Sequence, residues 1–127
     1  MEINKGYLFV FFMAVLLSCA TSGMDPNLIH DLYVDDFQSD DISTCKISDV
    51  DLSHHQAKLF FQKARQVDYK IIQDHYEVGP CYIEGPLVYE GEPCSWKIRP
   101  GATGSITCKK NVWYFVCDNC QDLFESK

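Results

Sequence analysis

The residues of this chain best suited to chemistry are two cysteines near its C-terminus, in the sequence Cys117-Asp118-Asn119-Cys120. Thiols at this spacing can form a redox dithiol, half of a zinc site or a structural disulfide. A redox dithiol needs a helix beside it to lower the pKa of the first thiol, and few residues follow Cys120. A strong zinc pattern needs a second closely spaced pair, which the sequence lacks. The pattern therefore favours structural disulfides over redox or zinc chemistry.

The number of cysteines supports that interpretation. Without Cys19, which belongs to the N-terminal leader, six remain: Cys45, Cys81, Cys94, Cys108, Cys117 and Cys120. An even number in an exported chain indicates up to three disulfides. We expect Cys94 to pair with Cys108, because a turn near Gly101 brings them opposite each other. The other pairings stay open, since Cys117 and Cys120 can join each other or the two earlier cysteines.

Other catalytic arrangements are not evident. The four histidines, His30, His54, His55 and His75, all precede the cysteine-rich part and show no metal-ligand spacing. No serine lies in a nucleophile elbow. The net charge of −7 disfavours binding to nucleic acid, whose phosphates repel an acidic surface. We therefore expect neither an enzyme nor a cofactor.

The N-terminus is typical of an export signal. An unbroken apolar run, residues 7–17, is too short to span a membrane and fits the core of a secretory signal. The residues that follow, Leu16-Leu17-Ser18-Cys19-Ala20, resemble the lipobox of bacterial lipoproteins. We therefore predict a signal peptide over residues 1–19 and lipidation at Cys19, with the outer membrane favoured. Cleavage after Ala20, giving a secreted or soluble periplasmic protein, is the alternative.

An acidic stretch follows and is predicted to be a solvated tether over residues 20–51. Residues 24–51 hold eight aspartates and one lysine, a net charge of −7. High charge with little hydrophobic periodicity favours disorder. An acidic arm for a basic partner is one alternative. A calcium site built from the pairs Asp35-Asp36 and Asp40-Asp41 is another, although no glycine-containing calcium loop is present.

The domain predicted over residues 52–127 begins with a helix. Ser53 and Gln56 form a capping box, and apolar residues recur at helical spacing, which predicts an amphipathic helix over 54–67. In the stretch 69–76, Ile71, Ile72 and His75 could continue the helical spacing, but the two isoleucines and two tyrosines favour a strand, which is the prediction adopted.

Short alternating runs then predict an antiparallel meander with strands at 81–89, 94–99, 105–109 and 112–117. Pro86 indicates that the first of these is an edge strand or carries a bulge. The tail, 121–127, is predicted to hold a short helical turn. The expected fold is α+β: one N-terminal amphipathic helix packed on a four- to five-stranded antiparallel β-meander, stapled by disulfides.

Aromatic residues are dense in the meander, and most must belong to the core. Some can lie on the outer face of the sheet, where aromatic side chains dominate binding energies. The candidate binding patch consists of Tyr82, Trp113 and Tyr114. At least one of the adjacent residues Trp113 and Tyr114 must point outward if their strand is regular.

Four stretches of the meander carry a resemblance to known proteins: residues 81–85, 94–99, 101–104 and 114–120. They read CYIEG, CSWKIR, GATG and YFVCDNC, and they resemble a group of small, uncharacterised proteins and lipoproteins of the Gram-negative envelope. The resemblance covers roughly Leu52 to Phe124. It implies export and one compact domain, and it implies no activity.

Together these features predict an exported, lipid-anchored binding protein that faces the periplasm. Small exported modules without catalytic residues often inhibit or neutralise toxins and hydrolases, so a basic toxin or hydrolase is the expected partner. A redox- or zinc-binding protein that uses Cys117 and Cys120 is one alternative. A purely structural envelope lipoprotein is another.

Overall fold

The structure, a computed structural model, describes residues 23–39, 50–76 and 80–125. Cys19, Cys45, the predicted signal peptide and the pair Asp40-Asp41 lie outside these residues. The helices are the 3-10 helix η1 (Pro26–Leu28), α2 (His54–Lys63), α3 (Tyr69–His75) and α4 (Gln121–Glu125). The strands are β1 (Ile29–His30), β2 (Asp36–Ser39), β3 (Arg65–Val67), β4 (Cys81–Tyr89), β5 (Glu92–Arg99), β6 (Thr103–Cys108) and β7 (Asn111–Val116).

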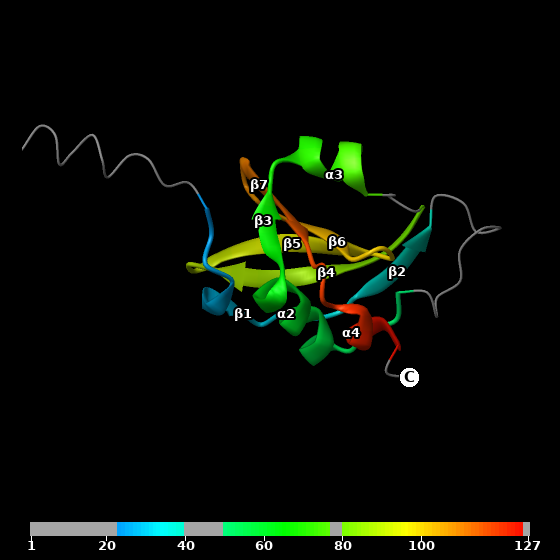
Figure 1. Cartoon of the computed structure of the whole chain (residues 1–127). Helices are drawn as coiled ribbons and strands as arrows, with labels where there is room; N and C mark the ends of the chain where they lie inside the picture. The colour runs from blue at the N-terminus through cyan, green and yellow to red at the C-terminus, as the bar shows by residue number, and fades with distance from the viewer. Residues whose placement is uncertain (1–22, 40–49, 77–79, 126–127) are drawn as a thin grey trace, which may run out of the picture.

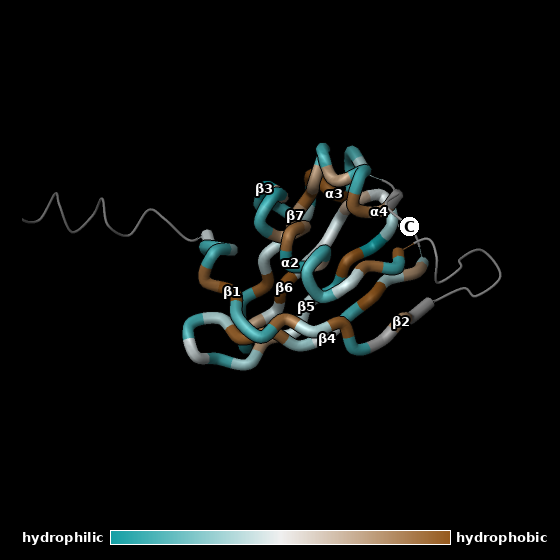
Figure 2. Tube along the Cα trace, turned by 90° about the horizontal axis from the view of Figure 1, so that it is seen from below, coloured by the Kyte–Doolittle hydropathy of each residue, from teal (hydrophilic) through white to brown (hydrophobic). Residues whose placement is uncertain are grey.

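One antiparallel sheet organises the described chain, and the α+β class is confirmed. Six strands follow one another in the order β1-β4-β5-β6-β7-β3, and β2 also pairs with β4. The sheet is curled into a half-barrel with α2 and α4 on one side and α3 on the other (Figure 1). The apolar stretches follow its strands (Figure 2). The sheet is larger than the four to five strands predicted, because segments outside the meander add strands to both of its edges.

The meander itself was predicted correctly. Cys94, Trp96 and Ile98 of β5 are buried, while Ser95 and Lys97 between them are exposed. The turn between β4 and β5 consists of Glu90 and Gly91, which have φ values of 52° and 76°. Positive φ at both positions of a two-residue turn matches the twist of the flanking strands. Local sequence therefore sets the register of this hairpin.

Pro86 has a different role from the one predicted. Strand β4 is not an edge, because β1 pairs with Val88 and Tyr89, and β2 pairs with residues 81–84. Pro86 lies between these two pairings, where its carbonyl accepts a hydrogen bond from Tyr33 N–H at 3.1 Å. A residue without an N–H is tolerated where one paired segment stops and the next begins.

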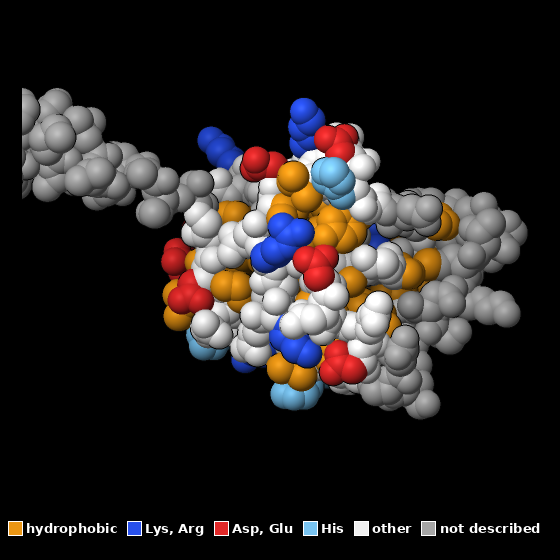
Figure 3. Space-filling view, viewed as in Figure 1, with side chains coloured by type: hydrophobic (Ala, Val, Ile, Leu, Met, Phe, Trp, Pro, Cys, Tyr) orange, Lys and Arg blue, Asp and Glu red, His pale blue; other side chains and the backbone are white. Residues whose placement is uncertain are grey.

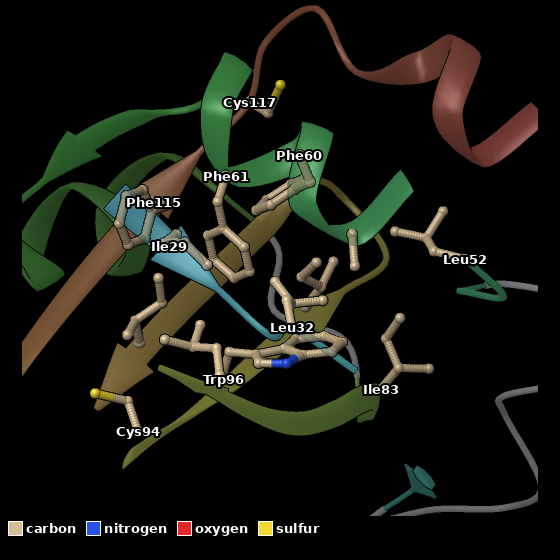
Figure 4. Packing of buried hydrophobic residues seen from close by; sticks show 14 of the residues in the cluster. Ile29, Leu32, Leu52, Phe60, Phe61, Ile83, Cys94, Trp96, Phe115 and Cys117 are labelled. Atoms are coloured by element: carbon tan, nitrogen blue, oxygen red, sulfur yellow. The ribbon is translucent and has the colours of Figure 1, made fainter. Parts of the chain in front are cut away.

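Helix α2 covers the inner face of the curled sheet. Its predicted capping box is present: Gln56 N–H donates to Ser53 Oγ at 3.2 Å, and Ser53 N–H donates to Gln56 Oε1 at 2.9 Å. Phe60 and Phe61 are fully buried. The ring of Phe61 packs edge-on against Trp96 and Phe115, at 6.0 and 5.1 Å between ring centres (Figure 4). This aromatic cluster is the middle of the hydrophobic core.

The predicted C-terminal boundary of this helix, residue 67, was wrong. The helix ends at Lys63, and Ala64 has an extended backbone. Residues 65–67 form β3, whose Arg65 and Val67 pair with Val116 and Tyr114 of β7. The helical spacing of apolar residues continues to Val67 and gave no sign of this strand. The strand forms because it pairs with the edge of β7, which lies far away in the sequence.

The strand predicted over 69–76 was also wrong, because Tyr69–His75 form α3. Ile72 is buried, while Lys70, Gln73 and Asp74 are exposed, so the segment has one apolar side. Packing on the outer face of the sheet outweighs the β preference of its isoleucines and tyrosines. None of the helices in the described parts of the chain is long and apolar enough to cross a membrane.

The tether prediction was wrong for residues 23–39. Met24, Ile29 and Leu32 are buried in the core, and β1 and β2 pair with β4. At the start of the segment, Met24 N–H donates to Gln66 Oε1 at 3.0 Å, and Gln66 Nε2 donates to the Met24 carbonyl at 2.6 Å. The segment thus contacts β3 at one edge of the sheet and pairs with β4, the first strand of the meander, on the opposite side.

Two disulfides are described. Cys94–Cys108 joins adjacent strands with a Cα–Cα distance of 4.5 Å, which confirms the predicted pair. Cys117–Cys120 is the second, so these neighbouring cysteines pair with each other. Cys81 is also disulfide-bonded, and its partner lies outside the described residues.

Candidate functional site

The predicted patch residues Trp113 and Tyr114 border a groove of about 650 Å³ at one end of the sheet. Strand β3, the start of α3 and the start of β7 supply most of its walls. Figure 3, in the orientation of Figure 1, shows hydrophobic side chains gathered below α3. We call this the aromatic groove; it is lined by Gly23, Gln66, Val67, Asp68, Tyr69, Ile71, Asn111, Val112, Trp113 and Tyr114.

Two aromatic pairs support the aromatic groove. The ring of Tyr114 lies 4.9 Å from that of Tyr69, and Trp113 packs edge-on against Tyr89 at 5.8 Å. Trp113 and Tyr114 are each half-buried, so neither is purely core or purely surface. Sequence reasoning missed Tyr69, which is 49% exposed, because the segment that carries it was assigned to a strand.

Tyr82, the third patch residue, does not line the aromatic groove. It lies near the start of β4, with the ammonium of Lys97 and the guanidinium of Arg99 over its ring at 4.7 and 4.6 Å. Cations over a tyrosine face are attracted by its quadrupole. A smaller groove, about 200 Å³, links this cation–tyrosine site to the aromatic groove, since Lys97, Arg99, Tyr69 and Tyr114 all line it. The outer face thus joins Tyr82 to Tyr114, whereas Trp113 lies on the core side of β7, packed against Tyr89.

Charges of both signs lie at the cation–tyrosine site. Glu84 of β4 is the register partner of Lys97, and both lie on the outer face of the sheet. No ion pair of Lys97 occurs within the described residues. A surface with mixed charges and aromatic rings can recognise a polar protein surface.

A second cluster, which the sequence did not reveal, lies at the opposite end from the aromatic groove. The Tyr76 hydroxyl donates to Asp118 Oδ1 at 2.6 Å, and Arg65 Nε donates to Asp118 Oδ2 at 3.1 Å. Arg65 Nη2 also donates to the Tyr76 hydroxyl at 3.2 Å. The three side chains come from β3, the C-cap of α3 and the loop after β7. Nothing in their local sequence connects them.

Hydrogen bonds in this cluster change the ionisation of its members. The Tyr76 hydroxyl, and then Arg65, lower the pKa of Asp118 below its usual value. Donation to Asp118 raises the pKa of Tyr76, because loss of its proton would break that bond. The hydrogen bond to Asp118 is also the main reason that the pKa of Arg65 is raised. The cluster favours one charge state of each group and ties α3 to the loop of Asp118.

The neighbouring Cys117–Cys120 disulfide is poorly exposed. Cys117 retains 4% of its accessible surface and Cys120 retains none. Helix α4 starts after the second cysteine and has five residues, so it is not placed behind the first one. Redox cysteines are normally accessible and electropositive in environment. This arrangement fits a structural disulfide.

The histidines are not gathered into a site. The N–H of Val34 donates to His54 Nδ1 at 2.7 Å, and the His54 ring packs edge-on against Tyr33. His54 thereby fastens the N-terminal segment to the start of α2. Among the described residues, no group of three or more His, Cys, Asp or Glu side chains is placed to hold a metal ion.

Comparison of the chain with protein-family models, curated proteins and solved structures found no match. The function must therefore be inferred from the chemistry of the surface itself. Its distinctive part is the continuous outer face that runs from the aromatic groove to Tyr82.

Proposed function

We propose that the protein is an exported, lipid-anchored binding protein of the bacterial envelope, which contacts a protein partner through the outer face of its sheet. The observation that carries this proposal is the cation–tyrosine site, where Lys97 and Arg99 lie over the ring of Tyr82 on the outer face. Tyrosine and arginine are enriched in protein interfaces, and their rings and guanidinium groups supply most of the binding energy.

The partner that we favour is a basic toxin or hydrolase. The whole chain has a net charge of −7, which steers a basic protein toward it. Asp25, Asp31 and Asp35 remain exposed within the ordered N-terminal segment. Long-range attraction would therefore arise from the carboxylates, while the outer face provides the short-range contacts.

The proposal is tested by isolating the protein with its partner. Tagged full-length chain is cross-linked in intact cells and purified from envelope extracts. The wild type should recover one stoichiometric partner, and a Tyr82→Ser/Lys97→Glu variant should lose it. Lys58→Glu is the matched control, because Lys58 lies on α2, across the sheet from Tyr82. Recovery of no stoichiometric partner by the wild type would sink the proposal.

The redox or zinc alternative receives less support, because both sulfurs of Cys117 and Cys120 are joined and buried. Alkylation without reduction distinguishes the two ideas. A structural disulfide leaves both cysteines unlabelled before and after chelation. Labelling under mild reducing conditions, or after chelation, would favour the alternative. For a purely structural lipoprotein, deletion should change detergent sensitivity while toxin sensitivity stays the same.

A further inference from the structure

One end of the half-barrel differs from the rest of the surface. It contains the turns at 90–91 and 109–110 and Gly23, the first described residue, all at the left of Figure 1. Gly23 lines the aromatic groove and also a neighbouring groove of about 320 Å³, and Trp113 borders both. The chain therefore enters the fold beside Trp113. We call this end the entry end.

Exposed apolar side chains concentrate at the entry end. Among the residues that the structure describes, four large hydrophobic side chains are prominently exposed, and two of them, Tyr69 (49%) and Val112 (44%), line the aromatic groove. Leu28 (44%) precedes Ile29, which pairs with Tyr89 beside the turn at 90–91. Only Tyr33 lies elsewhere among the described residues. A gathering of exposed apolar side chains usually marks an interaction site.

The sequence before Gly23 indicates what covers this end. Cys19, the predicted lipidation site, is four residues from Gly23, and a fully extended chain of that length spans at most about 14 Å. The chain belongs to the fold from residue 23 onward, so no long tether separates the fold from Cys19. A lipid attached to Cys19 would therefore hold the entry end next to the bilayer. The surface of the entry end must then be compatible with a neighbouring membrane.

The side chains at the entry end suit that location. Tryptophan and tyrosine favour the membrane–water interface, where an apolar ring and a polar group are both satisfied. Lys109 and Lys110 lie beside the groove, but Lys109 is paired with Glu92 at 3.1 Å, and Glu90 lies nearby. Both signs of charge are thus present. Burial of apolar surface, rather than attraction to anionic lipid, would drive the contact.

We propose that the entry end, formed by Leu28, Tyr69, Val112 and Trp113, docks on the surface of a phospholipid bilayer. This inference rests on the lipid anchor of the proposed function. It also orients the molecule. Strand β4 runs from Cys81 to Tyr89, so Tyr82 lies toward its far end, as do Lys97 and Arg99 of β5. The cation–tyrosine site then points away from the bilayer and stays open to a partner.

The two tryptophans provide a direct test. Trp96 is 1% exposed in the core, and Trp113 is half-buried at the entry end. Full-length protein from the membrane fraction is reconstituted into phosphatidylcholine vesicles, with or without lipid brominated near the headgroup end of its chains. Bromine should lower the Trp113 emission roughly twofold or more, because the side chain lies at the interface. Trp113→Phe should abolish this quenching and leave the Trp96 emission unquenched.

Two further variants test the surface itself. Leu28→Glu/Val112→Glu should reduce the quenching of Trp113 while leaving the fold intact, since both side chains are exposed. Tyr33→Glu is the matched control, with a similarly exposed side chain away from the entry end, and it should quench like the wild type. Intact mass and vesicle flotation establish beforehand whether the chain carries a lipid and stays with the vesicles.

The outcomes separate this inference from the proposed function. Lipidated protein that floats with vesicles, but whose Trp113 is not quenched, would overturn membrane docking and leave the anchor in place. Unquenched Trp113 together with a dimer in sedimentation would assign the entry end to contact with a second copy of the chain. This result would also overturn membrane docking. A chain without lipid that does not bind vesicles would refute both the anchor and the docking. Loss of the protein partner alone would refute only the proposed function.

Discussion

The N-terminal segment, residues 23–39, and the meander, residues 81–116, both contribute buried side chains to the core, by different means. The strands of the meander follow one another through short turns and pair with their neighbours. The N-terminal segment reaches residues far along the chain, as in the 2.9 Å hydrogen bond from Asp25 N–H to the Tyr89 hydroxyl across 64 residues. Ile29 in the first region and Ile106 in the second are both fully buried.

The difference shows that charge and burial are compatible when a segment packs by one side only. Asp31 and Asp35 are exposed on the same segment whose Leu32 is buried. The composition of this segment is typical of disorder, and it therefore gave no indication of β1 and β2, which both pair with β4. Four measurements test this difference between the two regions.

The largest effect is expected at Gly85, where the two regions cross. A Cβ at this position would overlap the carbonyl of Tyr33, whose oxygen accepts the Trp96 indole N–H at 3.2 Å. Backbone cannot move aside as a flexible side chain can, so Gly85→Val should lower the free energy of unfolding by about 4 kcal/mol. Urea unfolding measures this. Gly91→Ala is the control: its Cβ meets nothing, and its positive φ should cost about 1 kcal/mol.

The second measurement compares the regions directly through a matched pair. Ile29→Ala and Ile106→Ala each remove a fully buried side chain, so each should cost about 3 kcal/mol in the free energy of unfolding. Leu28→Ala, at an exposed position, should cost less than about 1 kcal/mol. If Ile29→Ala were as harmless as Leu28→Ala, the N-terminal segment would be a tether after all.

The third measurement ranks the two described disulfides. Replacing both Cys94 and Cys108 by alanine opens a loop with a separation of 14 residues and should cost about 3 kcal/mol. The same change at Cys117 and Cys120, with a separation of 3, should cost about 2 kcal/mol. Double variants leave no unpaired thiol, so the comparison is matched. Equal or reversed costs in urea unfolding would argue against loop entropy as the main contribution.

The smallest effect is a pH dependence at the cluster of Arg65, Tyr76 and Asp118. The folded pKa of Asp118 lies below its unfolded value of about 3.8. Its contribution to stability is therefore fully present above that value and is lost as the pH falls through the folded pKa. Wild type should melt above Asp118→Asn at neutral pH, and the gap in Tm should narrow below pH 3.8. A gap that does not change with pH would contradict this, and Asp74→Asn serves as the control.

Local rules predicted the parts of the fold that depend on neighbouring residues. The alternation in β5, the capping box of α2 and the Cys94–Cys108 pair all follow from residues within one turn or hairpin. The C-terminal boundary of α2 and the helical structure of α3 do not follow from neighbouring residues. Arg65 lies outside the helix because it pairs with Val116 of β7, and Ile72 is buried because α3 packs on the outer face of the sheet beside Tyr114.

The candidate patch of Tyr82, Trp113 and Tyr114 stays a prediction, and its arrangement could not be predicted from the sequence. Tyr82 belongs to the cation–tyrosine site, whereas Trp113 and Tyr114 border the aromatic groove. Tyr69 and the cations that complete the surface come from other elements. Cross-strand register brings them together, and a single strand read alone does not contain that information.

Turn chemistry, capping and two-residue alternation act over a few residues, so the sequence alone predicts the meander, the first turns of α2 and the pairing of Cys94 with Cys108. Long-range contacts instead explain why residues 23–39 complete the sheet, why β3 and α3 follow α2, and why Tyr69 packs against Tyr114. An unpaired strand edge and an uncovered apolar face are satisfied by whichever segment reaches them. In this protein those segments are remote in sequence and weak in local preference.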